Sequence, residues 1–511
     1  MKNTQMNCGC ADVYRSDRRI RLEEDSTLPD YCSDIVRVIK VDATPFVGSR
    51  KAYVRDGTLF IDVEGNVYFN AVYVTEGGNT ESYGFFANYF DSVKSDVANV
   101  DPDSISPFIT VTAENVVCKV QSPRRIGMKA EVVICADVKG NVTYECFSGK
   151  GDGRVEVKEK ATVSMRVEDH KDGEFKVSKE VVLPSGLPPM ERMLSAKLTL
   201  APESASSGDG KVNYWGNAGI TCIYVPEYDG EGRGDIKAFY QPFEIKGSME
   251  MEEATSDMTA FLDMAPVSFD FEIRSDALGE NRILNAEFTY GVECIVTENA
   301  DTIITEDIYG IASRVSPSYD RREFRRFAGT LKDTTALKEQ ITLKSGIDML
   351  EGADARVQLR DVSVSDGVMT VNSRVTVNAI GMGEDTSCAV SESFDIPLRI
   401  TVPSDVTSPV SFDVTQSVGF VDTRTENGNA YVSFELDTVA QLYSGETLTY
   451  VATAEVEEEE ERRESLLFCY PCETDTLWSI GKKYGVGISA LSRANSLSDQ
   501  ELKRVMVIPT E

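Results

Sequence analysis

The chain has 511 residues, 41% of them hydrophobic and 27% charged, which are proportions typical of globular proteins. Its 84 acidic residues outnumber its 52 basic ones, so the net charge is −32. A surface of this charge repels nucleic acids and anionic lipids over most of its area, and we therefore expect neither a nucleic-acid partner nor direct insertion into a membrane. The length allows three or four domains, each with its own hydrophobic core.

The N-terminal segment, residues 1–29, lacks the apolar core of a secretory signal peptide. Nowhere do about eighteen apolar residues follow one another, as a membrane-spanning helix requires. We therefore expect a cytoplasmic protein whose eleven cysteines are mostly buried, reduced thiols. Two close pairs, Cys8 with Cys10 and Cys469 with Cys472, could form a four-thiolate zinc site only by meeting across the whole chain, so we expect no metal site.

A loose pattern recurs three times in the long central part of the chain. Gly65-Asn66 in the first copy aligns with Gly216-Asn217 in the second. Each copy opens with an apolar strand and later carries a phenylalanine followed by an acidic residue, which we interpret as a packing position at a strand end; these steps are Phe90-Asp91, Phe243-Glu244 and Phe394-Asp395. The repeats predict three modules, which span residues 30–185, 186–332 and 333–454.

Apolar and polar residues alternate within the modules with a period of two, as in half-buried antiparallel strands. Asp-Gly pairs at 56–57, 209–210 and 366–367 predict tight turns between such strands. A short helix is expected over residues 333–343, between the second and third modules. The predicted fold class is mainly β, with three tandem antiparallel β modules.

A run of glutamates follows the third module. Residues 455–465 are predicted to form an extended, solvated linker, because like charges repel one another and cannot be buried. A separate domain therefore begins near residue 466.

Residues 466–511 are predicted to form this small C-terminal α+β domain of order βααβ. Thr476 can cap a first helix that ends at Gly485. A second helix is predicted over Ser489–Asn495, with Leu491 and Ala494 facing the core. Short apolar strands precede the first helix and follow the second.

This domain resembles the LysM module. The common LysM pattern is GDTLW-x-IA-x-x-Y-G, then L-x-x-AN-x-L and an L-x-IP ending, and the chain carries "DTLWSIGKKYGV" from Asp475, then "LSRANSL" and "VMVIP". The sequence departs from the pattern at Thr474, where LysM modules usually carry glycine. A side chain at this position adds bulk at the rim of the binding groove.

In glycan-binding LysM modules, N-acetylglucosamine lies between the loop before the first helix and the loop after the second. The resemblance therefore implies a groove that binds a partner or a glycan, formed by Asp475, Thr476, Leu477, Trp478, Ala494, Asn495, Ser496 and Leu497. Packing in the core or at the rim is the alternative role for Leu477 and Trp478. An aromatic side chain at position 478 could also anchor a protein contact.

The three modules resemble SPOCS modules, a family associated with the spore coat. The resemblance rests on the opening "PDYCSDIVRVIKVDA" at Pro29, the strand ending "AVYV" and the later phenylalanine–acid step. Several SPOCS modules followed by a LysM module is the layout of the SipL-like proteins of spore-forming clostridia. In that family the LysM module binds the coat-basement ATPase, stage IV sporulation protein A. The resemblance implies a scaffold for spore coat assembly, located in the mother cell cytoplasm at the forespore surface.

We expect no enzymatic activity and no cofactor. The single histidine, His170, lies in a charged stretch predicted to be a solvated turn. The sequence carries no serine-elbow, phosphate-loop or HExxH motif, and Asp229–Asp235 lacks the ligand spacing of a calcium loop. Two alternatives to the scaffold are a cell-wall protein whose LysM module holds peptidoglycan or N-acetylglucosamine, and a hydrolase delivered by that module.

Overall fold

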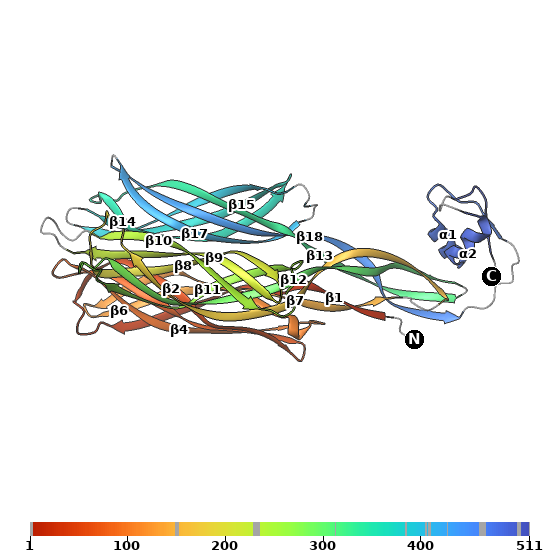
Figure 1. Cartoon of the computed structure of the whole chain (residues 1–511), viewed down its shortest axis with the longest axis horizontal. Helices are drawn as coiled ribbons and strands as arrows, with labels where there is room; N and C mark the ends of the chain where they lie inside the picture. Colours follow the sequence, from red (N-terminus) through yellow and green to blue (C-terminus); the bar gives the residue numbers. More distant parts are fainter. Residues whose placement is uncertain are drawn as a thin grey trace.

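The computed structural model describes residues 4–148, 153–227, 236–311, 313–383, 386–403, 406, 410–426, 428–458, 467–497 and 502–509. Strands hold 78% of the residues and helices 4%, which confirms the mainly β fold class. The strands form a long body that narrows into a stalk, and the helices α1 and α2 lie beyond the end of the stalk (Figure 1).

Three modules of one design build the body and the stalk. Module 1 contains β1 (Thr4–Thr27), β2 (Ile35–Arg55), β3 (Thr58–Thr75), β4 (Thr80–Asp96), the 3-10 turn Pro102–Ser104, β5 (Ser106–Ser122) and β6 (Arg125–Phe147). Module 2 contains β7 (Val155–Val182), β8 (Met190–Gly208), β9 (Lys211–Pro226), β10 (Lys237–Glu250), β11 (Thr259–Arg274) and β12 (Ile283–Gly310). Module 3 contains β13 (Ser313–Ile341), β14 (Met349–Ser365), β15 (Val368–Met382), β16 (Ser387–Thr401), β17 (Val410–Glu426) and β18 (Asn429–Glu458).

Each module is a sandwich of two three-stranded antiparallel sheets. One sheet joins three consecutive strands, as in β2-β3-β4, and the other pairs the first and fifth strands with the sixth, as in β1-β6-β5. The alternating pattern determines which side chains face inward: Leu59, Ile61 and Val63 of β3 are at most 2% exposed, and they belong to a buried cluster that both sheets of module 1 share.

The predicted Asp-Gly turns connect two strands in every module. Asp56, Asp209 and Asp366 have φ of 51°, 52° and 52°, and the glycine that follows each one also has a positive φ. Two successive positive φ angles define the type I′ turn, whose twist matches that of the flanking strands. Glycine and aspartate are among the few residues that adopt this conformation without large strain.

When the modules are aligned on these turns, the alignment of the repeats predicted from the sequence changes in module 1. Phe243 and Phe394 hold equivalent positions in their modules, opposite Ala218 and Val375. Tyr89, opposite Gly65, holds this position in module 1. Tyr89 is 4% exposed whereas Phe90 is 63% exposed, so the packing role predicted for Phe90 is wrong and the first Phe-acid step is out of register by one residue.

The opening strand of each module lies ahead of the boundary expected from the sequence. β1 falls in the predicted N-terminal segment, yet it pairs along its length with β6. β7 and most of β13 fall in the module predicted to precede their own, yet they pair with β12 and β18. The helix expected over residues 333–343 is wrong as well, because β13 continues as a strand to Ile341.

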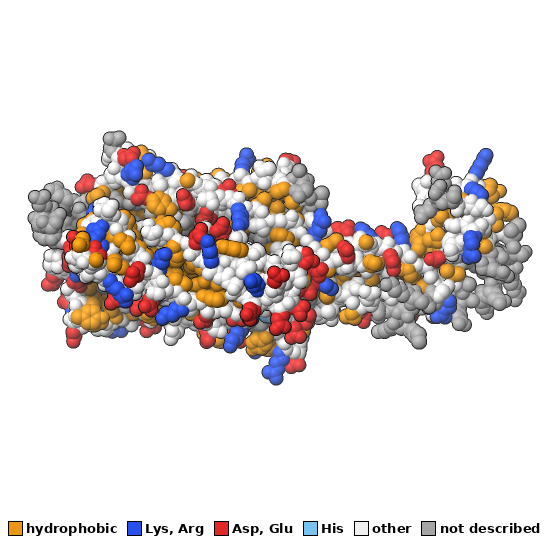
Figure 2. All heavy atoms as spheres, viewed as in Figure 1, with side chains coloured by type: hydrophobic (Ala, Val, Ile, Leu, Met, Phe, Trp, Pro, Cys, Tyr) orange, Lys and Arg blue, Asp and Glu red, His pale blue; other side chains and the backbone are white. Residues whose placement is uncertain are grey.

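Beyond the sandwiches, the three antiparallel strand pairs β1–β6, β7–β12 and β13–β18 pack against one another and form the stalk (Figure 1). Tyr144 of β6, Ile304 of β12 and Tyr450 of β18 share one buried cluster, to which every module contributes. In the body, a further cluster joins Ile39, Ile223 and Ile380, again one from each module. The modules are therefore interlocked. On the surface, acidic side chains gather where the body narrows into the stalk (Figure 2).

The C-terminal unit has the predicted order βααβ. β19 (Leu467–Cys469) pairs with β20 (Met506–Ile508). The helices α1 (Leu477–Tyr484) and α2 (Ile488–Asn495) lie between these two strands in the sequence. α2 starts at Ile488 with Gly487 as its cap, one residue before the predicted start at Ser489. Leu491 is buried as predicted, but Ala494 is exposed.

The glutamate run does not begin as a free linker. Glu455 and Glu457 belong to β18, where they lie opposite Ser316 and Arg314 of β13. The rest of the predicted linker, residues 459–465, lies outside the described residues.

Candidate functional site

The eight candidate groove residues divide into four groups when they are placed on the C-terminal unit. Leu477 and Asn495 are internal, Trp478 faces the stalk, and Thr476, Ala494 and Ser496 are exposed. Asp475 and Leu497 are partly buried. The structure thus brings both predicted loops to one small unit, but only part of the set is free to bind another molecule.

The loop before α1 is held rigid by its own polar groups. Thr476 caps the helix: its hydroxyl accepts a hydrogen bond from the Ser479 amide at 3.1 Å, and its amide donates to the Ser479 hydroxyl at 2.9 Å. This reciprocal pair is a capping box with serine in place of the usual glutamate. Asp475 accepts a hydrogen bond from the Cys472 amide at 2.8 Å and so closes the preceding turn.

Asn495 is a structural residue of this unit. Its side-chain amide donates to the Leu491 carbonyl at 2.8 Å and to the Val507 carbonyl at 2.7 Å, and it accepts a bond from the Val507 amide at 2.6 Å. The side chain is 5% exposed. It therefore joins α2 to β20 and leaves little of its polar surface for a ligand. Leu477, 7% exposed, belongs to the core of the unit beside Ile480 and Leu491.

The exposed part of the predicted groove, which we call the rim, consists of Thr476, Ala494 and Ser496. Ser496 ends α2 in the left-handed conformation, with φ 50°, and its amide donates to the Arg493 carbonyl. Residues 498–501, which follow the rim, lie outside the described residues.

Trp478 is bound by the stalk. Its indole Nε1 donates to Asp307 Oδ2 at 2.8 Å, and its ring meets the Tyr309 ring edge-to-face with centroids 4.8 Å apart. Lys482, one turn further along α1, donates to the same carboxylate at 2.6 Å and 2.7 Å. Asp307 and Tyr309 lie near the end of β12. We call the surface formed by Trp478, Lys482 and their stalk partners the docking contact.

Two backbone groups complete the docking contact. The Tyr309 hydroxyl donates to the Val486 carbonyl at 2.9 Å, and the Ile488 amide donates to Glu156 Oε1 at 2.8 Å. Gly481 permits this approach, since a Cβ at this position would lie 2.3 Å from the Tyr309 hydroxyl oxygen. Sequence reasoning identified Trp478 as a possible protein anchor but not its partners, because Glu156 and Asp307 lie in β7 and β12, far away in the chain.

The electrostatics of the docking contact favour an ionised Asp307. Burial by itself raises the pKa of this carboxyl, but hydrogen bonds from Lys482, Trp478, the Ile308 amide and Tyr319 outweigh it and lower the pKa below its ordinary value. The contact is therefore charge-assisted throughout the neutral pH range.

Comparison with known families identifies the C-terminal unit. Residues 473–508 match the LysM domain family. This segment is a LysM domain. The match to this family is an indication of binding to peptidoglycan or another carbohydrate. No curated protein and no solved structure matches the chain.

The other candidate positions lie apart from the LysM domain. His170, expected in a solvated turn, lies instead in β7 opposite Ile295. All eleven cysteines are free thiols, and five of them are buried: Cys10, Cys146, Cys222, Cys294 and Cys469. Within the described ranges, no cluster of three His, Cys, Asp or Glu side chains is placed to hold a metal ion. In the same part of the chain, no helix has the length and apolar character needed to cross a bilayer. The faint calcium-loop candidate, Asp229–Asp235, falls outside the described residues.

Proposed function

We propose that the chain is a non-enzymatic assembly scaffold whose LysM domain binds a protein partner. The observation that carries this proposal is the docking contact: Trp478 and Lys482 bind a carboxylate and an aromatic ring of another polypeptide segment, which is the chemistry of a protein interface. The interlocked modules suit a scaffold, because clusters shared by all three modules hold them in a fixed arrangement.

The partner follows from the family resemblance of the modules and the LysM domain. SPOCS-like modules followed by a LysM domain characterise the SipL-like proteins, in which the LysM domain binds stage IV sporulation protein A. We infer the same ATPase as the partner here, and the cytoplasm of the mother cell, at the forespore surface, as the location. The rim residues Thr476, Ala494 and Ser496 are the surface offered to the ATPase, since Trp478 is held by the docking contact and Leu477 and Asn495 lie inside the domain.

Glycan binding is the second candidate, and the match of residues 473–508 to the LysM family favours it. The two loops that would hold N-acetylglucosamine are both present. However, the Asn495 side chain is hydrogen-bonded to β20, and the Trp478 side chain is hydrogen-bonded to the stalk. A sugar would therefore contact mainly the rim and backbone groups.

The test compares the two ligands on the full-length chain. Purified ATPase is captured on the immobilised protein, and in parallel the protein is sedimented with peptidoglycan. We expect capture of the ATPase and no enrichment in the peptidoglycan pellet. Sedimentation with peptidoglycan together with failure to capture the ATPase would reverse the order of the two candidates.

A pair of matched variants locates the binding surface. Ala494→Arg places a bulky charged side chain on the rim, and we expect it to weaken ATPase capture at least about tenfold, the loss of one good interface contact. Ser489→Arg makes a similar change on an exposed turn of the same helix and serves as the control. Asp307→Asn is expected to leave capture unchanged. Stronger capture by Asp307→Asn would instead place the partner on Trp478 and Lys482.

A further inference from the structure

A large cavity lies where the three modules meet in the body. Its volume is about 740 Å³, within the usual range for sites that bind small molecules. Module 1 lines it through β2 and β5, module 2 through β8, and module 3 through β14 to β17. Apolar side chains, among them Val41, Val111, Leu200, Val357 and Val418, form much of the wall.

A group of buried charges faces this cavity. Lys40 of β2 is 4% exposed and makes ion pairs with both Asp42 and Asp354. Lys197 of β8 and Arg356 of β14 line the same cavity, and both also line a narrow void beside it together with the two aspartates. The group therefore contains three cations and two carboxylates, so that one positive charge is not neutralised.

Lys197 carries this excess charge. Arg356 donates to the backbone carbonyls of Ala113, at 2.5 Å, and Ala43, at 3.5 Å. The Lys197 side chain, by contrast, makes no hydrogen bond or ion pair with any residue in the described part of the chain, and both aspartates bond to Lys40. Burial lowers the pKa of the partly buried Lys197, the attraction of Asp354 opposes this shift, and the neighbouring Arg356 and Lys40 add to it.

The remaining charged residues of the wall do not neutralise Lys197. Glu114 accepts a hydrogen bond from Arg19 at 2.7 Å, and Gln358 also donates to it. Arg374 is paired with Asp395 at 2.7 Å. Arg360 adds a further positive charge at the wall. The wall thus offers Lys197 no further carboxylate, and its positive charge remains without a counterion there.

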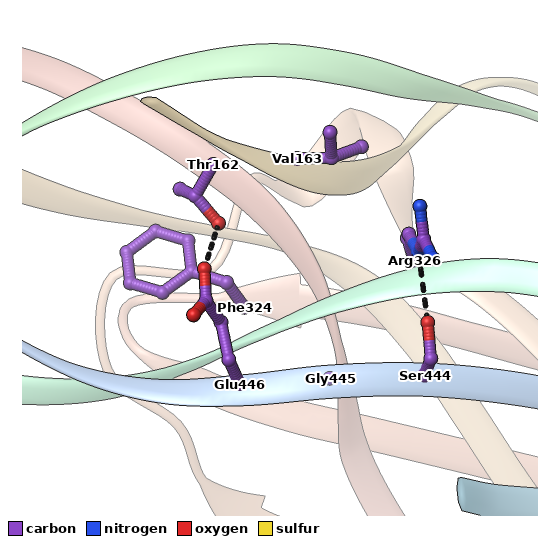
Figure 3. A pocket seen from close by; sticks show the side chains of 7 residues that line it. All are labelled: Thr162, Val163, Phe324, Arg326, Ser444, Gly445 and Glu446. Atoms are coloured by element: carbon purple, nitrogen blue, oxygen red, sulfur yellow. Dashed lines mark hydrogen bonds between the residues drawn. The ribbon is translucent and has the colours of Figure 1, made fainter. Parts of the chain in front are cut away.

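A second cavity, of about 390 Å³, shows what a satisfied polar pocket looks like in this protein (Figure 3). It lies between β7, β13 and β18 in the stalk. Its Arg326 donates to Ser444 at 2.8 Å, and its Glu446 accepts a bond from Thr162 at 3.0 Å (Figure 3). Glu446 also accepts a bond from Lys160 at 2.9 Å. The polar groups of this pocket already have partners, so it does not call for a charged ligand.

We propose that the cavity between the three modules binds a small organic anion, with its carboxylate or phosphate group on the Lys197 ammonium and its apolar body against the aliphatic wall. The anion supplies the missing negative charge, and a charge-assisted hydrogen bond in a partly desolvated site is stronger than one in water. All three modules contribute to the wall, so the bound anion contacts each of them.

The test is calorimetric titration of the full-length protein with phenyl phosphate and with benzoate, which carry the two candidate groups on the same ring. We expect at least one of them to bind saturably at one site per chain. Benzyl alcohol keeps the ring without the charge, and we expect it to bind at least about tenfold more weakly. The proposal is overturned if neither anion binds, or if benzyl alcohol binds equally well.

Variants of Lys197 separate a binding role from a structural one. Lys197→Met should weaken anion binding at least about tenfold, Lys197→Arg should retain it within about threefold, and Lys211→Met, a change on an exposed strand residue of the same module, should leave it unchanged. Without ligand, Lys197→Met should have an unfolding temperature equal to or higher than that of the wild type, because it leaves two cations facing two carboxylates. A lower unfolding temperature would mean that Lys197 is neutralised within the fold, and this contradicts the proposal.

Discussion

At the scale of single residues, the LysM sequence motif mixes side chains that build the domain with side chains that are free to bind. Asn495 and Leu477 lie in the motif as candidate ligand contacts, yet Asn495 bonds to the backbone of α2 and β20, and Leu477 is part of the core. Spacing along the sequence could not distinguish these roles, because the strand that receives the Asn495 bonds, β20, lies beyond the second loop. Trp478 was ambiguous for the same reason, since its partners lie in another module.

Asn495→Ala tests the structural role of this amide. The change removes one hydrogen bond to Leu491 and two to Val507, and we expect it to destabilise the LysM domain by about 2–4 kcal/mol. Hydrogen exchange at the β20 amides in the full-length chain measures the effect. Ala494→Ser, on the exposed neighbouring position, is the control and should change nothing. If Asn495→Ala leaves exchange unaltered while abolishing ligand binding, Asn495 is a ligand contact and our assignment is wrong.

At the scale of strands and sheets, the period of two and the Asp-Gly turns predicted most hairpins correctly, because both are local properties of the sequence. The opening strand of each module could not be assigned in this way, since β1, β7 and β13 pair with strands more than a hundred residues later. The stretch after Asp333 contains good helix formers such as Leu337 and Lys338, but its side chains alternate between inner and outer faces. Pairing with β18 therefore overrides helix propensity.

A buried ion group joins two of these sheets. Arg50 of β2 lies 2.6 Å from Asp263 of β11 and 2.9 Å from Glu293 of β12, so that it connects module 1 with module 2. Burial raises the pKa of Glu293 to about 8, although Arg50 opposes the shift, and the nearby Asp172 and Asp263 add to it. The folded protein therefore binds a proton at Glu293 that the unfolded chain, with an ordinary pKa of about 4.3, releases.

The sign of the pH dependence follows from this raised pKa. The stabilising contribution of protonated Glu293 is complete below about pH 4.3 and is lost as the pH rises through about 8. We expect the unfolding temperature of the wild type to fall by roughly a few degrees between pH 6 and pH 9 because of this residue, and Glu293→Gln to remove that part of the slope. Glu287→Gln, on the same strand and paired with Lys176, is the control. Equal slopes in wild type and Glu293→Gln would show that Glu293 is already ionised in the fold.

At the scale of the whole molecule, three modules with separate cores are joined by smaller shared clusters and extend three strand pairs into one stalk. The LysM domain lies against the end of that stalk. The sequence repeats indicated three modules, but not that they interlock, because clusters such as Ile39 with Ile223 and Ile380 join residues that have no pattern in common. The docking contact likewise depends on geometry between domains. Among the residues that the structure describes, it is where the LysM domain binds another polypeptide segment, and the proposed function rests on it.

The Ile488 amide tests the docking contact most directly, because it donates to Glu156 of the stalk rather than to its own domain. Its hydrogen exchange is measured in the full-length wild type and in Asp307→Asn, with the Leu491 amide, which bonds within the LysM domain to Gly487, as the internal reference. We predict slow exchange of the Ile488 amide in the wild type, exchange at least about tenfold faster in Asp307→Asn, and no change at Leu491. Equally fast exchange of the Ile488 amide in both proteins would contradict the account, since the LysM domain would then not be held by the stalk.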